Sequence, residues 1–371
     1  MTSLRRWLAV LTGVAVLLTL PSAVGALPAK KSDLSASDLL GRIQRSGSVG
    51  YSGYAESAGG LALPVTNQFS MVADLFGGRR QLRTWWRSDR DWRVDSIGLA
   101  GETDVHADPT GFWSWDYESN TATYAGQLAS PEIRLPTDTD LLPPNLTRRL
   151  LGEARISEAT RLPSARVAGI SAAGLRIRPS EPESSIDHID VWADPNSGLP
   201  LRVKVFGKQS GSPAMSASFL QVRVSSPPAS STGFAIPAGA ELESGTGPDL
   251  ATALDELGGA VLPSRLAGIE LNGQLPNLGS IAVYGRGVTE FAVVPLPRRI
   301  GYALRRQIAP AVAAADGSNP NPSDLALSVG PLNLLLTSFN DPGGPWLLVG
   351  TVTASTLAAA AKSLPAQSGP R

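Results

Sequence analysis

Residues 80–124 have the sequence RQLRTWWRSDRDWRVDSIGLAGETDVHADPTGFWSWDYESNTATY. Apolar and aromatic side chains alternate with polar ones through most of this stretch, which is typical of strands with one buried face. Turns such as Ser88-Asp89 and Ser119-Asn120 separate the runs. A connection of that length cannot cross a sheet, so consecutive strands must pair antiparallel. The stretch therefore predicts a β-meander.

The alternation continues on both sides of this meander. Further strands are expected at 49–54, 69–75, 165–177, 186–193, 199–206 and 214–224. Together these runs predict about eleven strands, and an antiparallel sheet of that size must twist and curl.

Two helical patterns interrupt the strands. One is amphipathic and covers residues 38–45 after Ser37 as its N-cap, and the other starts near Pro144 and carries Leu146 and Leu150. Their positions suit helices that cover one face of the sheet. The predicted fold class is α+β, with a large curved antiparallel sheet, a half-barrel, beneath covering helices.

The pattern changes after residue 245. Helices are expected at 249–257, 298–315 and 355–364, and strands at 281–284, 290–295, 332–338 and 346–352. This is the content of a compact α+β unit. We therefore expect a half-barrel domain over residues 30–240 and a smaller α+β C-terminal domain over residues 249–365.

Residues 1–29 have the order of an export signal. Arg5 and Arg6 precede an uncharged run, and small residues follow it up to Ala26, where signal peptidase is expected to cut. The alternative is an uncleaved membrane anchor that continues to Leu27. Either outcome predicts an exported protein of a periplasm-like space, secreted or anchored to the outer face of the cytoplasmic membrane.

The composition argues against several kinds of function. Lysine plus arginine and aspartate plus glutamate both number 32, so no overall field attracts nucleic acid. Cysteine is absent, which removes thiolate metal sites, disulfides and the lipidated cysteine of a lipoprotein. His106 and His188 are the two histidines. We therefore expect no enzyme activity, no metal site and no cofactor.

Tryptophan gathers in one part of the predicted sheet. By alternation, Trp113 and Trp115 share a face, whereas Trp85 and Trp86 point to opposite faces. Excess aromatic surface on one face can line a site for a hydrophobic ligand; the alternative is that it fills the space beneath the helices. The candidate ligand-binding residues of an apolar concave face are Trp85, Trp92, Trp113, Trp115, Tyr117, Leu146 and Leu150.

Two polar groupings are weaker candidates for a site. Asp187, His188 and Asp190 could suggest a metal or acid-base cluster, but a polar outer strand face explains them better. The arginine pairs 298–299 and 305–306 mark one helix of the smaller domain. That helix face could dock on an acidic partner or on lipid headgroups, or could simply be solvated.

Several segments resemble a known family. In the large domain they are VWADPNSGLPLRV at 191–203, Ser218-Phe219 and FAIP at 234–237. These are similar to the late hairpin and closing strand of the LolA-like superfamily, and more narrowly to the MucB/RseB group of sigma-E regulatory proteins. The order of elements agrees, and the second domain resembles the small domain of that group. The composition, rich in leucine, alanine, glycine and proline, looks actinobacterial.

The resemblance implies a half-open barrel whose apolar concave face holds acyl chains, with no catalytic residues. It also implies a partner, the extracytoplasmic part of a membrane-spanning anti-sigma factor. The chain is therefore expected to be an envelope regulatory or sensor protein that binds a lipid-like ligand and an anti-sigma factor or another membrane protein.

The alternative function is a lipid or lipoprotein carrier, or an accessory subunit of an envelope transporter. The covering helix near Pro144 separates the two hypotheses. A carrier needs this helix to open over a large apolar cavity, whereas a protein that holds a partner can keep it shut.

Overall fold

The computed structural model describes Trp7 and residues 28–60, 77–98, 101–126, 137–208, 210–245, 262–273, 281–316, 323–338 and 344–365. Most of the expected export segment 1–29, the strand expected at 69–75 and the helix expected at 249–257 lie outside the described residues. No helix within the described ranges is long and apolar enough to cross a membrane.

Twelve strands form one sheet in the order β12-β6-β5-β4-β3-β2-β1-β11-β10-β9-β8-β7. Their bounds are β1 Tyr51–Gly59, β2 Arg79–Ser88, β3 Asp91–Ile97, β4 Glu102–Asp108, β5 Gly111–Asp116, β6 Thr121–Gly126, β7 Ala159–Val167, β8 Ile170–Ile177, β9 Ile186–Ala193, β10 Pro200–Gly207, β11 Met215–Arg223 and β12 Glu241–Ser244. All neighbours are antiparallel except β12 and β6. The large antiparallel sheet is confirmed, with one parallel edge strand that the sequence did not indicate.

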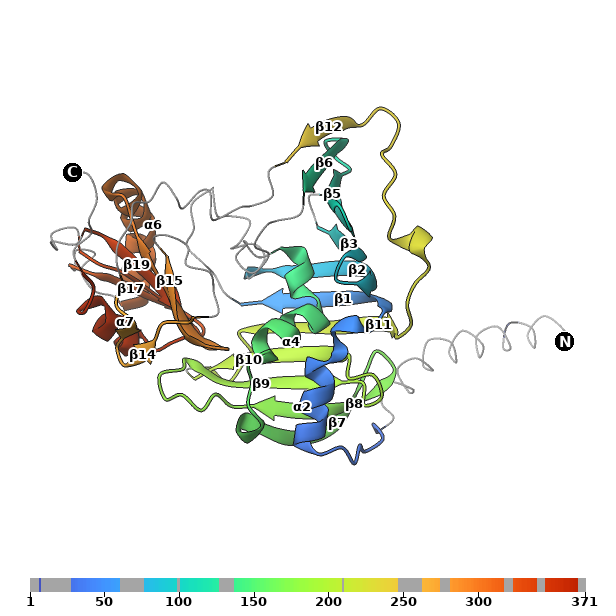
Figure 1. Ribbon diagram of the computed structural model, residues 1–371, viewed down its shortest axis with the longest axis horizontal. Helices are drawn as coiled ribbons and strands as arrows, with labels where there is room; N and C mark the ends of the chain where they lie inside the picture. The colour runs from blue at the N-terminus through green and yellow to red at the C-terminus, as the bar shows by residue number, and fades with distance from the viewer. Residues whose placement is uncertain are drawn as a thin grey trace.

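The first strand lies in the middle of this sheet (Figure 1). One edge of β1 pairs with β2, which begins a meander that runs to β6. The other edge pairs with β11, which ends a second meander that begins at β7. A register shift between Tyr54 and Ala55 interrupts the β1–β11 pairing. Because β1 joins the two meanders, the sheet needs contacts between the beginning and the end of the large domain.

Two α-helices, α2 (Ala36–Gln44) and α4 (Pro143–Leu151), pack on one face of the sheet, which we call the helix-covered face (Figure 1). Helix α2 lies over β7 and β8, and α4 lies over β10 and β11. The N-cap of α2 is Ser35 rather than the expected Ser37, because the Ser35 hydroxyl accepts the Asp38 N–H. Short 3₁₀ turns are η1 Ser46–Ser48, η3 Asp138–Leu141, η4 Ile156–Glu158 and η5 Ala229–Ser231.

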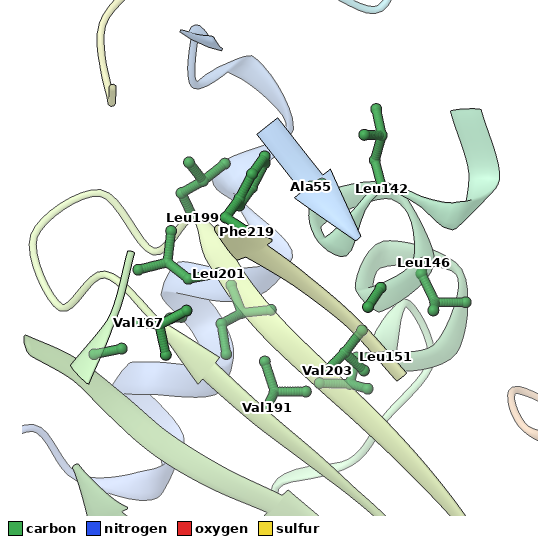
Figure 2. Close-up of a cluster of buried hydrophobic side chains, with 14 of the residues drawn as sticks. Ala55, Leu142, Leu146, Leu151, Val167, Val191, Leu199, Leu201, Val203 and Phe219 are labelled. Carbon is green, nitrogen blue, oxygen red and sulfur yellow. The ribbon is translucent and has the colours of Figure 1, made fainter. Parts of the chain in front are cut away.

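The main hydrophobic core fills the space between these helices and the sheet. Strand residues such as Val191, Leu201 and Val203 pack there with Leu146 and Leu151 of α4 (Figure 2). Side chains alternate along each strand, so the intervening residues point to the opposite side, which we call the outer face.

Residues 225–245, which we call the strap, leave the end of β11 and run to the far edge of the sheet (Figure 1). The Arg87 guanidinium donates to the Pro227 carbonyl at 2.7 Å, and the Asn120 amide donates to the Gly239 carbonyl at 2.8 Å. The strap ends as β12, which pairs with β6. It therefore ties the last strand of the first meander to the main chain that follows β11.

A second sheet has five strands in the order β15-β16-β19-β18-β17. Its elements are β15 Ala282–Arg286, β16 Thr289–Pro295, α6 Arg298–Asp316, β17 Leu325–Val329, β18 Leu332–Leu336, β19 Trp346–Gly350 and α7 Ala354–Ala361, preceded by a separate hairpin of β13 Arg265–Leu266 and β14 Ile269–Glu270. On β18, Leu336 packs with Ile308 of α6, and the adjacent Leu335 packs in the cluster of Leu357 from α7. The two helices therefore cover opposite faces, which confirms a smaller α+β unit.

Main-chain hydrogen bonds join the two sheets. The Ser185 N–H donates to the Thr351 carbonyl at 3.0 Å, and the Thr353 N–H donates to the Glu183 carbonyl at 2.7 Å. A β-bridge between Ser184 and Val352 lies among these bonds. The connection before β9 therefore extends along the end of β19, and the two units share backbone pairing rather than side-chain contact alone.

Candidate functional site

The helix-covered face carries a stack of aromatic rings. Tyr51 and Trp86 lie parallel with centroids 6.0 Å apart, and Trp86 and Trp92 lie parallel at 5.5 Å. Phe112 continues the row beside Trp92 at 6.0 Å, and Phe219 meets Tyr51 edge to face at 5.6 Å. Of the predicted ligand-binding tryptophans, Trp92 belongs to this stack, and it is 6% exposed. The stack is part of the packed core.

Helix α4 is shut over this face. Leu146 and Leu151 are buried in the main core, and Leu150 packs partly buried against it (Figure 2). Arg148, on the outward side of the same helix, donates to the Asp89 carboxylate at 2.8 Å in the turn between β2 and β3. Leu146 and Leu150, which were predicted to contact a ligand, therefore pack in the main core instead.

Four buried polar atoms on this face make no well-formed hydrogen bond to another described residue: Tyr51 Oη, Thr84 Oγ1, Trp86 Nε1 and Thr147 Oγ1. Their side chains are at most 4% exposed. Burial raises the pKa of Tyr51 well above its usual range, so its hydroxyl keeps its proton. The Thr84 hydroxyl nevertheless lies close enough to Tyr51 Oη to offset part of the rise in the Tyr51 pKa. A buried polar atom without a partner costs about 1–3 kcal/mol, so this group of atoms requires an explanation.

The other predicted site residues lie on the outer face. Trp85 alternates with the core residue Trp86, and Trp113 and Trp115 alternate with Phe112. Tyr117 packs edge to face on Trp115. The predicted set is therefore divided: Trp92, Leu146 and Leu150 face the helices, whereas Trp85, Trp113, Trp115 and Tyr117 do not. The seven residues cannot line one concave surface, because the period of a strand is two.

Ionised groups accompany the outer-face aromatics. Arg93 stacks on Trp85, at 5.1 Å from the ring centroid, and donates to Asp95 at 2.6 Å and to Asp104 at 2.7 Å. The Tyr117 hydroxyl donates to Asp104 at 3.2 Å. Burial and the neighbouring Asp95 carboxylate raise the pKa of Asp104 to about 6, which Arg93 offsets only in part.

Carboxylate oxygens of Asp95, Glu102 and Asp104 lie within 4.8 Å of one another, which is close enough for a shared cation. Arg93 and Arg83 already pair with these groups, the latter with Glu102 at 3.0 Å. An arginine placed among the ligands opposes a divalent ion, so the donor set fits an ion-pair network better than a metal site.

The groups at 187–190 form a polar outer face, as expected. His188 bonds to Asp187 at 2.5 Å and stacks on Phe206 at 4.3 Å. Asp190 accepts a two-pronged contact from Arg176 at 2.6 and 2.7 Å. Each carboxylate therefore has a nearby partner, and this arrangement does not assemble acid-base machinery.

The strap packs onto the outer face through one aromatic residue. Phe234 lies against Trp113 and His106, with centroids 5.2 and 5.0 Å apart. The His106 ring nitrogen Nδ1 bonds to the Thr232 carbonyl at 2.9 Å, and burial lowers the pKa of His106. Residue periodicity did not indicate this contact, because a single phenylalanine in a proline-rich segment has no repeating pattern that would predict its burial.

A charged pocket lies at the junction of the two sheets. It encloses about 250 Å³, open solvent included, between the end of α4 and the β15–β16 turn. Arg286 reaches across it to Glu158 and to Glu181, both at 2.6 Å. Burial raises the pKa of Glu158, but hydrogen bonds from the Arg155 N–H, Arg286 and Ser180 outweigh this and lower it overall. Such a pocket is too small for an acyl chain.

Comparison with known proteins gives matches among solved structures, whereas no family model and no curated protein matches the chain. The crystal structure of MucB in complex with MucA(peri) matches with 18% identity over 90% of this chain and 100% of that chain, at a TM-score of 0.48. The chain is similar to MucB. The MucA/MucB complex of Pseudomonas aeruginosa matches with 17% identity over 90% of this chain and 99% of that chain, at a TM-score of 0.47.

A LolA superfamily protein from Nitrosomonas europaea matches with 8% identity over 54% of this chain and 98% of its own, at a TM-score of 0.24. These structures belong to the two groups that the sequence segments resemble. The actinobacterial origin stays a prediction.

Proposed function

We propose that this chain is an exported regulatory protein of the cell envelope that works by binding a partner protein and not by catalysis. The observation that carries the proposal is the shut helix α4, whose Leu146 and Leu151 are buried in a continuous core. A lipid carrier that holds its lipid, or is about to bind it, needs an open apolar cavity of roughly several hundred Å³. The junction pocket, lined by Glu158 and Arg286, does not supply one.

The partner that we propose is the extracytoplasmic segment of an anti-sigma factor, which is what the sequence resemblance implies. The backbone pairing of 183–185 with 351–353 supports a two-sheet platform, because a partner that contacts both units meets one continuous surface. MucB, to which the chain is similar, was crystallised with MucA(peri).

Co-elution of the full chain with the extracytoplasmic domain of an anti-sigma factor from the same organism tests this proposal. We expect a stable complex in size-exclusion chromatography and none with an unrelated membrane protein's soluble domain. Absence of a complex, together with release of a copurified lipid in native mass spectrometry, would instead establish the carrier function.

A lipid-like ligand under α4 is the second part of the proposal, and it rests on the four unpaired polar atoms. If α4 lifts, Tyr51 Oη, Trp86 Nε1 and Thr147 Oγ1 become hydrogen-bonding groups at the floor and lid of an apolar groove. A ligand with an acyl chain and one polar group would satisfy them. In this scheme the ligand is the signal that changes partner binding.

The isosteric variant Thr147→Val separates this role from plain core packing. It removes an unpaired buried hydroxyl, so we expect the free energy of unfolding to rise by about 1 kcal/mol. We also expect weaker binding of a fluorescent fatty-acid probe. Thr289→Val is the matched control, since Thr289 Oγ1 is also buried and unpaired but lies in β16. Equal probe binding by both variants and by the unmodified chain would contradict the ligand proposal.

A further inference from the structure

Helix α6 presents a basic outer side that the proposed function does not use. Arg298, Arg299, Arg305 and Arg306 lie in its first half, and no acidic residue occurs between 298 and 315. The whole chain has a formal charge of zero, so this helix is a local concentration of positive charge.

The inward side of α6 is well defined. Ile308 and Val312 are buried against Leu325 and Leu336 of the five-stranded sheet. Arg305 lies at the edge of the inward side, because its Nη1 donates a hydrogen bond to the Ser323 carbonyl, just before β17, at 3.3 Å. The side that remains must therefore face outward.

Arg299, Tyr302 and Arg306 form the centre of the outward side. Their spacing of three and four residues places them on one stripe of an α-helix. Tyr302 is 52% exposed, and Ile300 at the flank of the stripe is 47% exposed. Arg299 and Arg306 are exposed and make no ion pair with another described residue. Two cations and one large exposed ring therefore share one surface, and Ile300 is exposed on an adjoining side of the same helix.

We propose that this outward side of α6 docks on an anionic lipid surface. Arginine pairs with lipid phosphates, and tyrosine and isoleucine gain by entering the headgroup region, where one end of a side chain is apolar and the other is hydrated. An acidic peptide would use the arginines but would leave Ile300 without a function. The uncleaved form of the N-terminal segment, the alternative to cleavage after Ala26, would hold the chain beside a membrane and so favours the lipid occupant.

The absence of cysteine makes a site-specific test simple. Ala303→Cys in the full chain carries a single polarity-sensitive fluorophore next to the stripe. We expect a blue shift with vesicles of phosphatidylcholine containing about 30 per cent phosphatidylglycerol, and none with pure phosphatidylcholine. High salt should reverse the shift, because surface charges are screened. A label at Ser88→Cys, in the turn after β2, should not respond.

Charge reversal identifies the residues responsible. We expect Arg299→Glu with Arg306→Glu to weaken the vesicle response at least about tenfold. The control Arg90→Glu with Arg223→Glu changes net charge equally at exposed positions of the large sheet and should respond like the parent. The proposal would be overturned if the label showed no shift, or an equal shift with both vesicle types. It would also be overturned if the double variant responded like the parent, or if polyglutamate alone caused the shift. None of these outcomes bears on partner binding.

Discussion

The indole rings of Trp86 and Trp92 lie parallel across neighbouring strands, with their planes 3° apart and their centroids 5.5 Å apart. The two residues are also register partners in β2 and β3. Because both rings face the covering helices, they stabilise the core rather than a surface.

Trp92→Ala is therefore expected to lower the free energy of unfolding by about 3–5 kcal/mol, since it leaves a large cavity beneath the helices. Trp85→Ala, on the other face of the adjacent strand, should cost about 1 kcal/mol, mainly through its contact with Arg93. Urea denaturation followed by circular dichroism measures both. Similar losses for the two variants would mean that the two faces are equally packed.

The pair Asp95 and Asp104 predicts an unusual pH dependence. The folded pKa of Asp104, about 6, is above the ordinary value of 3.8, so folding favours its protonated form. Keeping Asp104 ionised in the folded protein lowers the free energy of unfolding at pH values above the folded pKa. This loss of stability disappears as the pH falls toward the ordinary pKa. Asp104→Asn should be more stable than the parent by about 1 kcal/mol at neutral pH, and this advantage should disappear in acid. Thermal unfolding over a pH series measures it, and a constant difference would contradict the assignment.

Arg286 is expected to hold the two sheets in one orientation. Arg286→Ala leaves the buried Glu158 unpaired, which should cost about 2 kcal/mol and speed amide exchange at Ser185 and Thr353. Arg265→Ala, which breaks an exposed pair with Glu270, is the control and should change neither. The pKa of Glu158 is lowered in the folded protein, so its ionised carboxylate stabilises the fold at pH values above the ordinary pKa of 4.5. This stabilisation is lost as the pH falls through the folded pKa.

Phe234 should decide whether the strap stays on the outer face. Phe234→Ser removes the contacts with Trp113 and His106, so we expect faster amide exchange at Glu241 and Gly245, whose N–H groups bond to Asn120 and Tyr124. The global unfolding transition should move little. Ile236→Ser, at a residue that is 48% exposed on the same segment, should leave these amides protected.

Periodic segments could be predicted from the sequence. The alternation in 80–124 indicated β2 to β6, and the pattern of leucines after Pro144 indicated α4, because each element has a face that the core must bury. Helices α6 and α7 were expected within a few residues of their observed bounds. These elements carry their own signal in the spacing of apolar residues.

The missed elements lack such a signal. Strand β12 is four exposed residues, and it is a strand because β6 offers a free edge. Strand β17 follows a stretch of sequence rich in asparagine and proline, and the alternation of Leu325 and Leu327 is too short to stand out. The division of the candidate site over two faces follows from pairing register. Alternation predicted that Trp113 and Trp115 lie on the same face of the sheet, but it did not predict which face the helices would cover.

The placement of β1 has a consequence for the order in which the large sheet can form. β1 is made before every other strand of the sheet, yet its partner β11 is the last strand of the second meander, and the edge strand β12 follows it. The two meanders can each assemble from local pairs, but they cannot join until residues 215–245 are present. Joining them closes a very long loop, which slows folding. The nascent half-sheet of β1 to β6 must therefore wait with an open edge, and the strap is the segment that finally seals its far side.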